Sequence, residues 1–128
     1  MFKLNGEKIR NVLVFGAHPD DEIIGPGGTI ARLSDEGANV TVVTFTAGET
    51  AYSTPDMKNK MGDIRMGEAQ ACDGILGIDR RIVLGLPCQG VTNDTDTYQR
   101  CVKIIREVKP DLILSHTHRD KHRDHRTI

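Results

Sequence analysis

The sequence predicts one α/β domain with helices on both faces of a mostly parallel sheet. Its 128 residues suit a single domain, since domains usually contain roughly 100–200 residues. Four short apolar runs alternate along the chain with three segments of helical periodicity, and such alternation produces a parallel sheet between two layers of helices. We therefore expect a three-layer α/β/α sandwich of the Rossmann-like class.

The first two strands and the first helix follow from the spacing of apolar residues. Residues 11–17 (NVLVFGA) form a nearly continuous, β-branched run, which predicts a strand buried on both faces. Residues 22–36 have apolar side chains at roughly helical spacing and end at Gly37, although two glycines weaken the first half of this helix. Residues 39–46 (NVTVVTFT) predict the second strand.

Apolar spacing and turn residues also predict the remaining helices, strands and loops. Gly77 closes the second helix, and Pro110 ends the third. The expected segments are a loop over 47–57, a helix over 56–76, a short strand over 81–86, a loop over 87–96, a helix over 97–108, a buried strand over 111–115 and a polar stretch over 116–128.

Composition excludes several classes of protein. Seventeen basic and 18 acidic residues give a formal net charge of -1, and the aromatic fraction is 4%, so no basic, stacking-rich face for nucleic acid is expected. No apolar run approaches the roughly 20 residues of a membrane span, and no secretory signal is evident, so we expect a cytoplasmic protein. The three cysteines are widely spaced, which suits reduced thiols.

Polar side chains gather after two of the predicted strands. His18, Asp20 and Asp21 directly follow the first strand, and the other four histidines lie among the last 13 residues, after the fourth strand. Because ligands bind at the carboxyl ends of the strands in such sheets, we expect both groups at one edge.

These residue types suit a catalytic metal ion. His18 and Asp21 could offer a nitrogen and an oxygen to one cation, and His125 could complete a hydrolytic zinc site, which keeps a fourth position for water. His122 would then face the substrate, and Asp20 is placed to accept a proton from the water.

Each polar group alone has a simpler explanation. Carboxylates at a helix start often cap the helix and compensate its dipole, and a His-rich polar tail is usually solvated or binds metals nonspecifically. Their coincidence at one edge of the predicted sheet favours the metal site.

Two motifs in this context resemble those of a known family. AHPDDE (residues 17–22) follows the first strand, and DxHxDH (residues 120–125) follows the fourth. Over almost its whole length, the chain is similar to the LmbE-like, or PIG-L-type, zinc-dependent N-deacetylases, which remove acyl groups, typically acetyl, from N-acylated amino sugars and their conjugates. Further segments that fit the family pattern in order are 27–31, 46–49, 65–68 and 76–77.

The resemblance implies a reaction and a role for each residue. It implies a zinc-dependent N-deacetylase in which a metal-activated water attacks the amide carbonyl of a small N-acetylated sugar or conjugate. Asp20 would be the general base, His122 would stabilise the developing oxyanion, and Asp124 would orient a neighbouring group. The implied ligands of zinc, or of another divalent metal such as Fe2+, are His18, Asp21 and His125.

Candidate substrate contacts have competing explanations. Arg65 is either a substrate-binding residue, as the resemblance favours, or half of an exposed i,i+3 ion pair with Glu68. Glu49 follows the second strand and is either a substrate contact or a solvated loop residue. His116 and His118 match no role in the family pattern, and we expect them to be loop residues.

Members of the family continue past the second motif with a further helix and further strands. We therefore expect residues 1–128 to form one domain that is the N-terminal part of a larger one. A second chain, as in a homo-oligomer, is the other possible source of the missing layer. Cys88 stands where relatives often carry an acidic residue, and we expect it to be an ordinary small side chain.

Two other functions are alternatives to the deacetylase. One is a noncatalytic metal- or sugar-binding module. The other is a nucleotide-binding domain, although residues 25–28 (GPGG) do not match the motif G-x-G-x-x-G.

Overall fold

A computed structural model describes residues 1–128. Its centre is a four-stranded sheet in the order β5-β4-β3-β6, and every neighbouring pair of strands is parallel. The strands are β3 (Asn11–Gly16), β4 (Asn39–Thr44), β5 (Arg80–Val83) and β6 (Leu112–Leu114). The predicted α/β class and the four predicted strands are confirmed.

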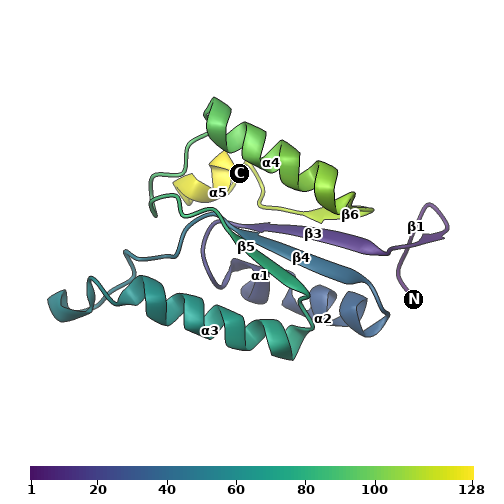
Figure 1. The fold of residues 1–128 in the computed structure, drawn as a ribbon, viewed down its shortest axis with the longest axis horizontal. Coiled ribbons are helices and arrows are strands. Elements are labelled where there is room, and N and C mark those ends of the chain that lie inside the picture. Colours follow the sequence, from purple (N-terminus) through teal and green to yellow (C-terminus); the bar gives the residue numbers. More distant parts are fainter.

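Helices cover both faces of this sheet (Figure 1). Helices α1, α2 and α3 lie on one side, and α4 and α5 lie on the other, which gives the three expected layers. The helices are α1 (Asp21–Ile24), α2 (Gly27–Asp35), α3 (Met61–Leu76), α4 (Thr95–Val108) and α5 (Arg123–Thr127), and a 3-10 turn, η1 (Pro55–Met57), precedes α3. The strands β1 (Lys3–Leu4) and β2 (Glu7–Lys8) form a separate antiparallel hairpin. None of the helices has the length and apolar character that a membrane crossing requires.

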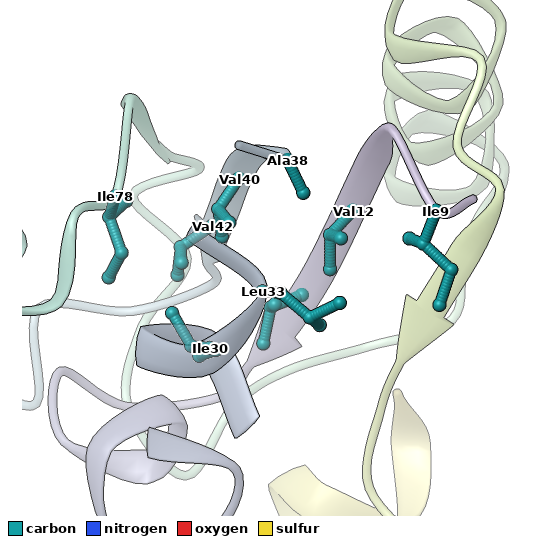
Figure 2. Close-up of a cluster of buried hydrophobic side chains, with 9 residues drawn as sticks. Ile9, Val12, Ile30, Leu33, Ala38, Val40, Val42 and Ile78 are labelled. Carbon is teal, nitrogen blue, oxygen red and sulfur yellow. The ribbon is translucent and has the colours of Figure 1, made fainter. Parts of the chain in front are cut away.

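The central strand β3 is buried on both faces, as its composition predicts. Val12 and Val14 pack on one side with Ile30 and Leu33 of α2, whereas Leu13 belongs to the apolar cluster on the α4 side. Figure 2 shows the first of these clusters between the strands and α2. Close packing on both sides holds β3 in place, so the polar segment that follows it starts from a fixed position.

The prediction of one continuous helix over 22–36 is wrong, because the structure divides it into α1 and α2. The break falls at Gly25 and Pro26. Proline has no amide hydrogen to donate, and its ring disfavours helical geometry at the preceding residue. Asp21 and Glu22 therefore belong to a separate single turn of helix, and Asp20 precedes it as the N-cap residue. The helix predicted over 56–76 begins later, at Met61.

The strand β6 is less buried than the sequence predicts. It pairs only with β3 and forms one edge of the sheet, and Ile113 is 43% exposed. Because β3 and β6 are parallel neighbours, the segments that follow them begin at the same end of the sheet, which we call its carboxyl edge. Figure 1 shows α5, in yellow, near this carboxyl edge.

Candidate metal centre

Three side chains from the two polar clusters converge at this edge. His18 follows β3, Asp21 begins α1, and His125 lies in α5. The Oδ2 atom of Asp21 is 3.5 Å from His18 Nδ1 and 3.3 Å from His125 Nε2. The two nitrogens are 3.3 Å apart, although the histidines are separated by 107 positions in the sequence. We call this set the ligand triangle.

Asp124 orients the ring of His18. Its Oδ2 atom is 2.9 Å from His18 Nε2, so this nitrogen carries a hydrogen, and Nδ1 is the nitrogen left to bind a metal once the metal displaces its proton. Asp124 is buried and also accepts hydrogen bonds from the backbone amides of Gln89 and Val91. Burial alone raises the pKa of Asp124, but the hydrogen bonds from His18 and the two amides lower it below its usual value. The carboxylate therefore stays ionised.

Asp120 orients His125 in the same way. Its Oδ2 atom is 3.0 Å from His125 Nδ1, which leaves the Nε2 lone pair free, and its Oδ1 atom accepts a hydrogen bond from the backbone amide of His122. The bonds from the amide of His122 and the ring of His125 lower the pKa of Asp120. Sequence reasoning gave Asp120 no role, although its place in the DxHxDH motif was an available signal.

The ligand triangle fits a divalent cation. Both histidines bond outward to carboxylates through one ring nitrogen, so their other nitrogens and the Asp21 oxygen face one another and can bind a metal ion in place of a proton. Metal–ligand distances of about 2.0–2.1 Å in tetrahedral geometry separate neighbouring donor atoms by about 3.3–3.4 Å, which is close to the dimensions of this triangle. Carboxylates on the outer nitrogens of metal-binding histidines are the usual supporting layer of such a site.

His116 lies closer to this site than we expected. It does occupy a loop, but its Nε2 atom is 3.3 Å from Asp21 Oδ2, and its ring stacks on His125 with ring centres 3.9 Å apart. The reason is topological, because His116 follows β6 at the point where this strand ends beside β3. Its Nε2 atom also accepts a hydrogen bond from the buried amide of Ala17. His118, two residues further on, is exposed.

His122 packs against the two histidines of the triangle. Its ring centre lies 4.6 Å from that of His18 and 4.8 Å from that of His125. The backbone amide of Asp124 donates to its Nδ1 atom, so the ring hydrogen is on Nε2. A nitrogen of His122 also lies within 4.8 Å of those of His18 and His125, but the occupied Nδ1 favours a role as a hydrogen-bond donor through Nε2.

Asp20 directly precedes Asp21 but has a different partner. It is the N-cap residue of α1, yet its side chain makes no capping hydrogen bond, which argues against the simple capping explanation. Its Oδ2 atom is 3.1 Å from Nη2 of Arg65. The ion pair of Arg65 is thus with Asp20, and none is found with Glu68.

Glu49 and Cys88 connect two loops beside the triangle. The Oε1 atom of Glu49 accepts a hydrogen bond of 2.7 Å from the amide of Cys88, so Glu49 is not a freely solvated loop residue. Cys88 Sγ accepts a hydrogen bond from the hydroxyl of Thr50 and lies within 4.8 Å of ligand atoms of His18 and Asp124. The role of Glu49 as a substrate contact stays a prediction.

Comparison with known protein families agrees with the two motifs. The family model PIG-L, described as GlcNAc-PI de-N-acetylase, matches residues 13–128, which include every residue of the ligand triangle. The chain belongs to the PIG-L family. In this PIG-L domain, the residues of both motifs come together at the carboxyl edge of the sheet.

Known proteins similar to this PIG-L chain include two that are named as deacetylases and one that is named as a hydratase. A protein of Thermobispora bispora named 1D-myo-inositol 2-acetamido-2-deoxy-alpha-D-glucopyranoside deacetylase is 35% identical over 84% of this chain and 44% of its own length. The structure of N,N'-diacetylchitobiose deacetylase from Pyrococcus horikoshii has a TM-score of 0.88 and 28% identity over 93% of this chain and 46% of that one. GalB, the 4-carboxy-2-hydroxymuconate hydratase from Pseudomonas putida, has a TM-score of 0.84 and 31% identity over 91% and 51% of the two chains. This PIG-L chain spans about half the length of these relatives.

Metal-free PIG-L protein should lose stability as the pH rises from 6.5 to about 9. Burial alone lowers the pKa of His18, but hydrogen bonds with Asp21 and Asp124 raise it from 6.5 to about 9. A pKa raised by folding stabilises the protein fully below the unfolded value, and the contribution is lost as the pH passes the folded value. Urea midpoints of chelator-treated protein at several pH values measure this, with His18→Gln as the variant that should lack the fall. A flat wild-type profile would contradict the expectation.

Proposed function

We propose that this PIG-L chain is part of a metal-dependent hydrolase that removes the acetyl group from an N-acetylated amino sugar or its conjugate. The observation that carries the proposal is the ligand triangle of His18, Asp21 and His125, with the carboxylate of Asp20 next to it in the chain. The names of two relatives support the substrate class, because each names a deacetylase of an acetylated sugar compound.

His18, Asp21 and His125 are the proposed ligands, and zinc is the proposed ion. Bound zinc would lower the pKa of a coordinated water toward about 7 and polarise a carbonyl oxygen. Two histidines and one carboxylate also suit Fe2+, so metal availability contributes to the choice of ion.

The remaining side chains handle the protons and the developing charge. Asp20 accepts a proton from the attacking water. The substrate carbonyl carbon becomes tetrahedral, and the Nε2 hydrogen of His122 stabilises the negative oxygen that forms on it. Asp20 then returns its proton to the leaving nitrogen, so that the products are a free amine and acetate. Asp124 acts as a positioning residue, because it holds the ring of His18.

A hydratase is the second candidate, because GalB shares this fold at 31% identity. Addition of water to a substrate also needs a proton acceptor for the water and a group that stabilises negative charge, so Asp20 and His122 would suit either reaction. The two reactions differ in their products, since deacetylation releases acetate and hydration releases no fragment.

Acetate release from a panel of N-acetylated amino sugars and their conjugates tests the proposal. The assay compares zinc-loaded protein with the same protein after chelation, and we expect acetate from at least one substrate only in the loaded sample. Water addition to an unsaturated carboxylic acid without acetate release would favour the hydratase. Binding of zinc and sugar without either reaction would favour a noncatalytic module.

A further inference from the structure

We propose that Arg65 is a positioning residue for Asp20, with the carbonyl of Gly48 as its anchor. The guanidinium group joins these two residues and holds the carboxylate of Asp20, the residue before Asp21 of the ligand triangle, in one orientation. This inference rests on the proposed function, because it concerns the general base of that reaction. It replaces the substrate-binding role that the family resemblance suggested for Arg65.

Arg65 reaches both partners from α3. Its Nη1 atom donates a hydrogen bond of 3.1 Å to the carbonyl oxygen of Gly48, and its Nη2 atom is 3.1 Å from Asp20 Oδ2. Its side chain is only 15% exposed, whereas that of Arg80, in an ion pair with Glu107, is 52% exposed. A sheltered guanidinium with two fixed partners loses less conformational freedom per contact than a mobile surface arginine.

Gly48 is suited to this contact by its lack of a side chain. Its φ is +63°, and a Cβ atom at this position would overlap with the guanidinium group of Arg65. The hydroxyl of Thr46 accepts a hydrogen bond from the amide of Gly48 and donates one to the carbonyl of Ala17. The loop that anchors Arg65 is therefore bonded to the segment that carries Asp20.

Asp20 depends on Arg65 more than the adjacent carboxylates do. Asp21 accepts a backbone hydrogen bond of 2.8 Å, and Glu22 is buried in an ion pair of 2.5 Å with Arg81. The side chain of Asp20 is 44% exposed, and its ion pair is with Arg65. Without the guanidinium, the carboxylate would be free to populate other staggered rotamers that point into solvent. Arg65 thus determines where the base points.

Replacement of Arg65 by Met should lower kcat and leave KM and metal content unchanged. We expect a loss of about 10–100-fold in kcat, the range typical of removing the supporting partners of a metal site. Arg65→Lys should keep part of the activity, because its charge remains but its single nitrogen replaces the two that contact Gly48 and Asp20. Guanidinium ion added to the Arg65→Met protein should restore part of the lost kcat, which a general loss of folding would not allow.

Gly48→Ala disturbs the contacts of Arg65 with Gly48 and Asp20 without removing the arginine. The new Cβ displaces the guanidinium, so we expect the same fall in kcat. Gly6→Ala is the matched control, because Gly6 has a φ of +86° and no neighbour within 4 Å of a built Cβ. Arg80→Met is the control for loss of an arginine. Both controls should keep the wild-type kcat and KM.

Several outcomes would overturn the proposal. A raised KM with unchanged kcat in Arg65→Met would identify a substrate-binding residue, and loss of bound zinc would identify a structural support of the metal. If the wild-type chain releases no acetate, the proposed function fails, and crystal structures of the zinc-loaded wild type and Arg65→Met then decide the positioning role. An Asp20 side chain that turns away in the variant supports the role, and one that stays in place refutes it.

Discussion

Replacement of Asp20 by Asn should lower kcat for acetate release by about 10²–10⁴-fold while the protein keeps its metal ion. The amide has nearly the shape of the carboxylate but cannot accept the proton of the attacking water. Metal content should persist because the ligand triangle consists of other side chains, His18, Asp21 and His125. The experiment therefore pairs kcat with metal content measured by elemental mass spectrometry on the same preparation.

Asp96→Asn is the matched control for this substitution. Asp96 lies in α4 with its side chain 80% exposed, so the same chemical change there should leave kcat and metal content at wild-type values. Undiminished activity in Asp20→Asn would refute the role of Asp20 as the base. Loss of metal in that variant would instead place Asp20 among the ligands.

The sequence predicts that His18 and His125 lie close together, because this prediction needs only the order of the strands and their parallel direction. Strands such as β3 and β6 can be recognised from their apolar sequence patterns alone. The carboxyl ends of parallel strands lie at the same edge of a sheet. Polar residues directly after such strands therefore come close even when more than one hundred positions separate them, as the distance of 3.3 Å between the two histidines shows.

Other features depend on contacts that no periodicity encodes. The stacking of His116 on His125 and the ion pair of Arg65 with Asp20 both depend on side-chain directions in loops. Loop backbones lack the repeating geometry that lets spacing predict direction in helices and strands. The break between α1 and α2, in contrast, has a signal in the sequence, which is Pro26. The apolar residues on both sides of Pro26 keep helical spacing, and this spacing predicted one continuous helix.

Replacement of His125 by Ala should abolish both metal binding and acetate release. Removal of an outer partner of a metal ligand typically costs about 10–100-fold in affinity, and loss of a ligand itself should cost more. His18→Ala should have the same effect, which would show that one site is assembled from both ends of the chain. His118→Ala is the matched control, because His118 is exposed in the same polar stretch and should leave metal content unchanged.

His116→Ala decides whether the site has three or four protein ligands. The Nε2 lone pair of His116 accepts the hydrogen bond from Ala17, so it is not free to bind a metal, and we expect this variant to retain metal. Metal loss equal to that of His125→Ala would add His116 to the ligands and leave no open position for water in a tetrahedral site. Full metal content in His125→Ala would refute the ligand triangle itself, because His18 and Asp21 alone cannot complete a catalytic zinc site.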